Sequence, residues 1–238
     1  EGAVCTFLLP YWGQGKAFND AAGKLTLDKT AAVNGLKMWL KMVDDGVIKK
    51  NVAEITTPVT VNEFKAGNVV FAINWGFAYD RFKDDADSKV KGNVGVMPLP
   101  AMTGGKSATC MGGWQWAMNA FSKNKEAAGK LIAFLASKQA SSFVAREGSI
   151  LPVFQSLYGD AEVNKVVPWF KDALPVVLGA QSRPMVEEYG QVSDIIRTTT
   201  LAGYVSCVNA IKAMAMHDHL HRIQLPVLFL AGAQDGGA

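Results

Sequence analysis

The chain has 238 residues and a formal net charge of +3, and 49% of its residues are hydrophobic and 19% charged. These proportions exclude an intrinsically disordered chain and provide enough apolar side chains for a sizeable core. The lysines are scattered along amphipathic segments, so neither nucleic acid nor an anionic membrane is an expected partner. No apolar run approaches the roughly 20 residues of a membrane-spanning helix, so we expect no direct membrane insertion.

The first predicted elements are helices with clear end signals. Asp28 is expected to cap a helix in which apolar residues recur at helical spacing from Val33 to Val43. Gly46 lies where a glycine commonly ends such a helix. A further helical turn is predicted from Val61 to Lys65, closed by Gly67.

Three apolar runs of strand length follow. Val69–Ile73 is continuous, as expected for a strand covered on both faces. Asn93–Met97 runs into Pro98-Leu99-Pro100, which cannot continue a strand, and Gly104-Gly105 predicts a turn before the third run, Trp114–Met118.

The chain then returns to helices. Ser122 is expected to cap one long helix that ends before Gly148, and an amphipathic helix is predicted over Val186–Thr200. The alternation of helices and strands predicts a layered α/β or α+β domain.

Complete motifs of catalytic chemistry are missing. There is no G-x-S-x-G nucleophile elbow, no phosphate-binding loop and no H-E-x-x-H zinc motif. Gly13-Gln14-Gly15 lacks the third glycine of a dinucleotide site. We therefore expect neither an enzyme nor a cofactor.

Two clusters of metal-ligating residues have a simpler interpretation. Asp84, Asp85 and Asp87 lack the ligand spacing and glycine of a calcium loop, which favours a solvated loop. Alternate spacing places His217, His219 and His221 on one face only in a strand, where they could hold Zn²⁺. Helix-forming residues lead directly into them, so the sequence predicts no metal site.

The cysteines leave one question open. Cys5, Cys110 and Cys207 have no metal-type spacing and cannot all pair with one another. Burial as small hydrophobic side chains fits all three. A Cys5–Cys110 disulfide in an oxidising compartment is the alternative.

Aromatic residues at strand ends give the first indication of a ligand. Trp75 follows the predicted strand Val69–Ile73, and Trp114 follows Gly112-Gly113. Open α/β sheets bind ligands beyond the carboxyl ends of their strands. Flat rings with polar edges suit a pyranose, which has an apolar C–H face and a rim of hydroxyls. The alternative is that both tryptophans belong to the core.

At these residues the sequence resembles the extracellular solute-binding proteins that deliver sugars to ABC importers. The resemblance lies in a series of pieces in the order typical of that family: Glu63-Phe64-Lys65-Ala66-Gly67-Asn68, Asn74-Trp75-Gly76, Val96-Met97-Pro98-Leu99-Pro100, Met111-Gly112-Gly113-Trp114, Ser122 to Ala128, Gly148-Ser149-Ile150-Leu151-Pro152, and Arg183-Pro184 with Tyr189 and Ser193.

The resemblance implies an α/β fold of the periplasmic-binding-protein type II, in which two lobes close on a ligand. It implies a periplasmic or extracellular, membrane-associated protein that captures a mono- or oligosaccharide without catalysis. Its partners would be the membrane subunits of the importer.

Specific roles follow from the matching motifs. Trp75 and Trp114 would stack on the sugar, Phe77 would extend the apolar wall, and the backbone N–H of Gly113 would bind a sugar hydroxyl. Arg183 would donate hydrogen bonds to sugar oxygens, although a surface salt bridge is an equally simple interpretation of this residue. Tyr11 or Trp12 is a further candidate.

The chain departs from the family at both ends. Members have about 400 residues, so the resemblance implies mostly the C-terminal lobe, with the N-terminal lobe largely missing. Glu1–Lys24 already resembles the middle of such a protein. No signal peptide is expected, because no basic segment followed by an apolar one opens the chain.

We expect residues 1–200 to be the binding-protein part and residues 201–238 to be a tail of different origin. The stretch from Arg222 to Gly236 resembles a late strand of enol-lactonase-like α/β-hydrolases, where Asp235 would be the acid of a triad. Without a nucleophile elbow or a following histidine, Asp235 has nothing to orient. The tail is then grafted or misassembled sequence, or a divergent natural C-terminus.

Two other functions therefore compete with sugar capture. One is a truncated or composite chain without independent function, and the other is an α/β-hydrolase fragment. A catalytic serine on a strand-to-helix turn would identify the hydrolase, and the sequence contains none.

Overall fold

The computed structural model describes residues 2–187 and 189–198. These residues divide into two compact units. Unit 1 comprises residues 2–55, 98–112 and 179–198, and unit 2 comprises residues 56–97 and 113–178. The tail from residue 201, with its three histidines and Asp235, lies outside the described residues.

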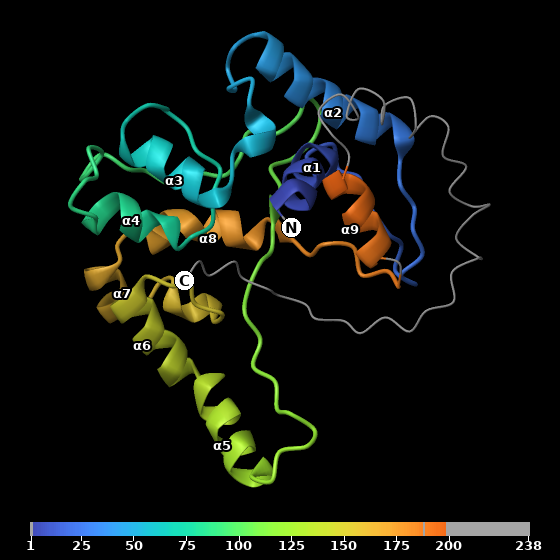
Figure 1. Ribbon diagram of the computed structural model, residues 1–238. Helices are drawn as coiled ribbons and strands as arrows, with labels where there is room; N and C mark the ends of the chain where they lie inside the picture. Colours follow the sequence, from blue (N-terminus) through green and yellow to red (C-terminus); the bar gives the residue numbers. More distant parts are fainter. Residues whose placement is uncertain (1, 188, 199–238) are drawn as a thin grey trace. The chain divides into compact units, whose positions relative to one another are not determined.

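Unit 1 contains the helices α1, α2 and α9 and two short strands (Figure 1). Their bounds are α1 Gly2–Trp12, α2 Lys29–Asp44, a 3₁₀ turn Val52–Glu54, β1 Thr109–Cys110, β2 Ala180–Gln181 and α9 Tyr189–Thr198. The strands pair in parallel, with Thr109 opposite Ala180 and Cys110 opposite Gln181. The predicted helix near Val186–Thr200 is confirmed, with its start at Tyr189.

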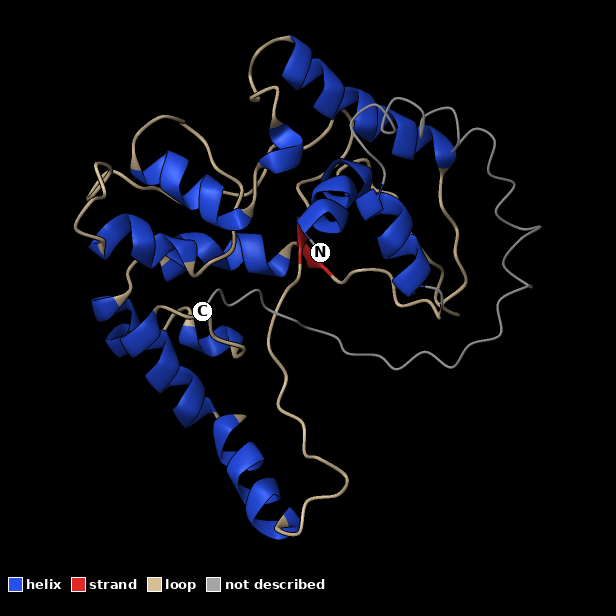
Figure 2. Cartoon of the chain, viewed as in Figure 1, coloured by secondary structure: helices blue, strands red, loops and turns tan. Residues whose placement is uncertain are grey.

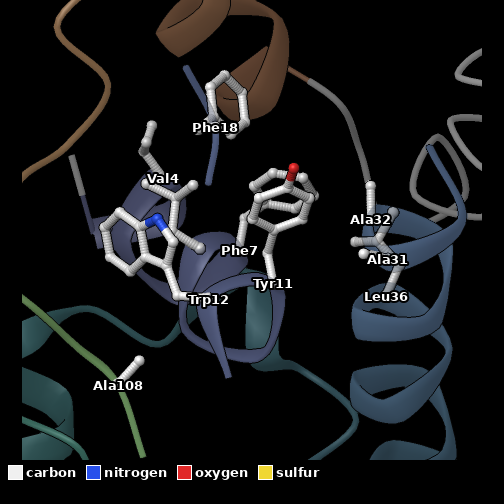
Figure 3. Close-up of a cluster of buried hydrophobic side chains, with 10 residues drawn as sticks. Val4, Phe7, Tyr11, Trp12, Phe18, Ala31, Ala32, Leu36 and Ala108 are labelled. Carbon is white, nitrogen blue, oxygen red and sulfur yellow. The ribbon is translucent and has the colours of Figure 1, made fainter. Parts of the chain in front are cut away.

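The core of unit 1 forms around α1 (Figure 3). This helix is apolar on almost every side and packs against α2, α9 and β1. Gly35 of α2 permits this close packing, because a Cβ there would lie 3.0 Å from Cγ of Pro10. The largest fully buried side chains of this unit are Tyr11, Leu8 and Leu36, followed by Val4.

Helix α2 confirms the predicted end signals. The Asp28 carboxylate accepts a hydrogen bond from the backbone N–H of Ala31 at 3.0 Å, which satisfies one of the free donors at the helix start. Gly46 follows the helix in the left-handed conformation, with φ 74°.

Unit 2 is helical in its regular parts (Figure 2). Its elements are α3 Thr57–Lys65, α4 Ala78–Asp84, α5 Lys125–Leu135, α6 Lys138–Gly148, a 3₁₀ turn Gln155–Leu157, α7 Ala161–Val166 and α8 Phe170–Leu178. One buried cluster joins α3 to α4 through Val61, Ala78 and Phe82. A larger cluster, which includes Leu157, Val163 and Phe170, joins α6, α7 and α8.

The three predicted strands of this region are wrong. Val69–Ile73, Asn93–Met97 and Trp114–Met118 have no regular secondary structure, and Phe71 is 80% exposed. A parallel strand is stabilised by neighbours on both sides and by layers on both faces. Within the described residues, these three segments pair with no strand.

The predicted long helix after Ser122 is divided into two. Helix α5 begins after Asn124, and its partner α6 begins after Ser137, whose hydroxyl accepts a hydrogen bond from Ala140 N at 3.2 Å. Ser122 instead accepts from Asn124 N in the preceding turn, at 3.2 Å. One helix was predicted because apolar residues recur at helical spacing on both sides of residues 136 and 137. The chain instead starts a new helix after Ser137, which caps it.

Candidate functional site

The loop that carries Trp75 is fixed by hydrogen bonds at its start. Asn74 Oδ1 accepts from Trp75 N at 2.8 Å, and Asn74 Nδ2 lies 3.5 Å from the carbonyl oxygen of Thr57. The Trp75 carbonyl then accepts from Ala78 N at 3.0 Å, which begins the first turn of α4. The loop is therefore tied to both α3 and α4 within unit 2.

Gly76 positions this loop against a distant segment of the same unit. A Cβ at Gly76 would lie 2.7 Å from Cδ1 of Leu151 and 3.7 Å from the ring of Trp169. Trp169 stacks on Tyr79, with ring centroids 4.5 Å apart and an interplanar angle of 20°. A side chain at this position would require Leu151 to move, so Gly76 allows the Asn74-Trp75-Gly76 piece to approach the Gly148–Pro152 piece closely.

Leu151, Trp169 and Tyr79 were missed by the sequence reasoning. Leu151 and Trp169 pack beside Gly76 in the Trp75 loop, and Tyr79 stacks on Trp169. Trp169 is buried together with its indole N–H. Trp169 lies in Pro168-Trp169-Phe170 at the start of α8, where nothing in the local pattern points toward residue 76. The only feature of the sequence that could have drawn attention to Trp169 is its position directly after Pro168.

The predicted aromatic platforms of unit 2 are exposed to solvent to different degrees. Trp75 is partly buried, Phe77 is exposed, and Trp114 is 59% exposed. Gly113 has open space where a side chain would be. Neither tryptophan is therefore a buried core residue, and stacking of the two rings on a sugar stays a prediction.

Tyr11 is a core residue in the structure, unlike its predicted role. Its side chain is fully buried, and its hydroxyl donates to the Ala17 carbonyl and accepts from Asp28 N, both at 2.9 Å. Burial is the main cause that raises the pKa of Tyr11 above its ordinary value. Trp12 is buried in the same cluster (Figure 3). Neither ring has a surface left for a ligand.

Arg183 follows the carboxyl end of a strand. It is half-buried and lies two residues beyond β2, while Pro184 after it is buried. The parallel pairing extends one step further, because Met111 N donates to the Gln181 carbonyl at 2.8 Å. Along the sequence, Gly113 and Trp114 come three and four residues after the end of β1. Gly113 and Trp114 in unit 2, and Arg183 in unit 1, each follow the carboxyl end of a parallel strand, the position at which α/β proteins place ligand-binding residues.

The acidic loop near α4 contacts a lysine. Asp85 and Asp87 each approach Nζ of Lys65 at 2.7 Å, and Lys65 is buried. The two carboxylates raise the pKa of Lys65, and Lys65 lowers the pKa of Asp87. The loop predicted to be simply solvated is therefore anchored to α3. Among the described residues, no group of three metal-ligating side chains is present.

With this geometry established, the chain can be compared with known proteins. Residues 4–141, more than half of the 238, match the family described as bacterial extracellular solute-binding proteins. The chain belongs to this family. The predicted resemblance is confirmed over that region.

Relatives of this solute-binding protein have names that describe binding and transport. A probable ABC transporter-binding protein of Deinococcus radiodurans is 35% identical over 202 residues, which cover 82% of this chain and 47% of the relative. A putative binding protein of Brucella abortus is 27% identical, over 77% of this chain and 44% of its own length. The chain spans about half the length of the curated relatives it matches.

Solved structures show the same fold. Maltose-bound MalE3 of T. maritima is 31% identical with a TM-score of 0.75, over 89% of this chain and 57% of that one. The GacH receptor of Streptomyces glaucescens, solved unliganded and with acarbose, is 28% identical with a TM-score of 0.71. That match covers 92% of this chain and 57% of GacH. The solute-binding protein described here therefore has part of a type II periplasmic-binding-protein fold, as predicted.

Proposed function

We propose that this solute-binding protein captures a carbohydrate, a mono- or oligosaccharide, outside the cytoplasm and presents it to the membrane subunits of an ABC importer. It does so without catalysis or a cofactor. The proposal is supported by the family and by two similar proteins, MalE3, which is maltose-bound, and GacH, which is solved in complex with acarbose. Within the described residues, no helix combines the length and apolarity needed to cross a bilayer.

The observation that carries the proposal is the exposed Trp114, directly after the open backbone of Gly113. A tryptophan that is 59% exposed presents a large apolar face to water. Stacking on the C–H face of a sugar would cover it. The N–H of Gly113 has no side chain beside it to prevent a sugar hydroxyl from approaching.

Trp75 and Phe77 are the other aromatic residues proposed to bind the sugar in unit 2, and Arg183 is a separate proposed ligand contact in unit 1. The loop that carries Trp75 packs through Gly76 against Leu151, so its backbone is held in place before a ligand arrives, which lowers the entropy lost on binding. The guanidinium of Arg183 can donate two parallel hydrogen bonds to neighbouring sugar oxygens.

Calorimetric titration of the chain with maltose and acarbose tests the proposal. We expect Trp114→Ala to weaken binding by about 1–3 kcal/mol, as for the loss of a well-packed aromatic contact. Phe121→Ala is the matched control, because Phe121 is another aromatic residue of the same segment and is 93% exposed. Equal losses from both substitutions would show that Trp114 has no specific role.

A second candidate function is that the chain does not bind sugar on its own. The match to only 47% of the Deinococcus relative, and to 57% of MalE3, favours this alternative. Absence of heat with every sugar would support it. Restoration of binding after addition of the unmatched half of the Deinococcus protein would show that the binding site also needs residues from that half.

We also propose the domain boundary near residue 200. The proposal is supported by the sequence, in which the stretch from Arg222 to Gly236 resembles a strand of a different fold. Deletion of residues 203–238 should therefore leave the melting temperature of the rest unchanged. A fall of more than about 8 °C, the shift expected for roughly 2 kcal/mol in a chain of this size, would make the tail part of the fold.

A further inference from the structure

Two cysteine sulfurs of unit 1 lie unusually close together. Sγ of Cys110 is 2.8 Å from Sγ of Cys5, although the two residues are 105 positions apart in sequence. Ordinary contacts between packed side-chain atoms are about 4 Å, and a disulfide bond is about 2.04 Å long. The separation is therefore nearer to a covalent bond than to simple packing.

The backbone on both sides holds this pair in place. Cys5 lies within α1 and is buried, and Cys110 ends β1 and is half-buried. Helix α1 packs directly against β1, and Cys110 contacts the same core cluster as Val4 and Leu8. On the other side, β1 is paired with β2. The proximity of the sulfurs thus follows from the packing of the unit.

We propose that Cys5 and Cys110 form a disulfide when the chain is in an oxidising compartment. The family is extracellular, and disulfides form and persist outside the cytoplasm. A small-molecule or protein disulfide serves as the oxidant. The two thiols lose two protons and two electrons, one S–S bond forms, and the oxidant's own S–S bond is reduced to two thiols.

The exposure of the two residues sets the order of the steps. Cys110 is the more accessible, so its thiolate attacks the oxidant first and forms a mixed disulfide. The buried Cys5 thiolate, already close to Sγ of Cys110, then displaces the oxidant's remaining thiolate. Exchange through a nearby second thiol is intramolecular and needs no further access from solvent.

The cross-link would connect α1 to the strand that leads into the proposed ligand-binding segment. A bond that closes a loop of this length restricts the unfolded chain more than one that closes a short loop. Oxidation should therefore raise the melting temperature by roughly 5–15 °C relative to the reduced chain.

The test is refolding of the full chain in a glutathione redox buffer, followed by digestion without reduction and mass spectrometry. We expect a peptide pair joined through Cys5 and Cys110, and an intact mass lower by two hydrogens. Cys207→Ser, the matched control, should give the same cross-link. Cys5→Ser should instead retain glutathione on Cys110, because the displacing thiolate is missing.

Two results would overturn the proposal. One is a chain that keeps all its thiols reactive toward Ellman's reagent after refolding under these conditions, while its melting temperature does not respond to reductant. The other is a cross-link that contains Cys207 in place of Cys5 or Cys110. Both measurements use the wild-type chain, so they remain decisive if a serine variant fails to fold.

Discussion

Two helices of equal length and similar apolar content differ strongly in how many of their residues are buried. Helices α1 and α5 both have 11 residues, and apolar side chains recur in both. Eight residues of α1 are buried, among them Leu8 and Tyr11 with no exposed surface. None of α5 is buried, and Leu131 is 57% exposed.

The difference lies in the partners that each unit supplies. Helix α1 packs against α2, α9 and β1, so most of its side chains, from Val4 to Trp12 with the exception of Thr6, are buried. In unit 2, α5 contacts α6 at one end, and nothing else in the described chain covers its apolar face to a similar extent. An apolar pattern therefore predicts which residues can be buried, whereas burial itself depends on segments elsewhere in the sequence.

The largest expected effect contrasts the two helices directly. Leu8→Ala should lower the free energy of unfolding by about 2–5 kcal/mol, because it removes buried methyl groups and leaves a cavity. Leu131→Ala, the same substitution on α5, should change it by no more than about 0.5 kcal/mol. Urea denaturation of both variants measures the difference. Equal losses would show that α5 is covered in solution.

The second contrast compares two buried tyrosine hydroxyls, one in each unit. Tyr11→Phe should cost about 1–3 kcal/mol, because it leaves Asp28 N and the Ala17 carbonyl without their shared partner. Tyr158→Phe should be neutral or slightly stabilising, because its hydroxyl has no hydrogen-bond partner among the described residues.

Burial also raises the pKa of Tyr158 to about 12, so its phenol stays neutral across the usual pH range. Urea denaturation at neutral pH compares the two variants without a change in ionisation. A larger loss of unfolding free energy for Tyr158→Phe than for Tyr11→Phe would show that the Tyr158 hydroxyl, and not the Tyr11 hydroxyl, makes the more stabilising hydrogen bond.

The third contrast uses pH on the Lys65–Asp87 ion pair of unit 2. The pKa of Asp87 is lowered in the folded state, so its contribution is present above about pH 4 and is lost as pH falls through the lowered pKa. The pKa of Lys65 is raised, so its contribution is present below about pH 10.4 and is lost as pH rises through the raised pKa.

Asp87→Asn should therefore lower the melting temperature between about pH 5 and 9, with a difference that shrinks toward both extremes. Melting curves of the wild type and the variant across that range measure it. A difference that is constant at all pH values would mean that the ion pair is not its cause.

The smallest effect is expected at the surface of α5. Lys130 Nζ and Glu126 Oε1 are 2.7 Å apart, but both side chains are exposed. Glu126→Gln should cost less than about 0.5 kcal/mol, and added salt should reduce that cost further. Thermal unfolding at low and high salt checks this, and a loss above about 1 kcal/mol would indicate that the helix surface is part of an interface.

Local signals in the sequence predicted the local structure well. Asp28, Gly46 and Gly67 correctly indicated where helices begin and end, because capping depends on residues a few positions apart. Val69–Ile73 failed as a strand, because strand formation depends on pairing with segments that are distant in sequence. The single helix expected after Ser122 failed for a local reason, since Ser137 is as good a cap as Ser122.

The site was predictable in part for the same reason. The exposure of Trp75 and Trp114 follows from their position after turns, which the sequence shows. The close contact of Gly76 with Leu151 and Trp169 joins segments that no periodicity connects. Tyr11 was mistaken for a ligand contact, because its neighbours Ala17 and Asp28 become its hydrogen-bond partners only in the folded chain.

The layout of unit 1 along the chain has a consequence for how the protein is made. Helix α1 is synthesised before the elements that cover it: β1 follows the first segment of unit 2, and α9 follows the whole of unit 2. At 5–20 residues per second, a ribosome needs on the order of 10 to 35 seconds to produce α9 after α1 has emerged. During that interval α1, the most apolar of the described helices, has α2 beside it but not α9. Completion of unit 1 therefore waits for the last described helix.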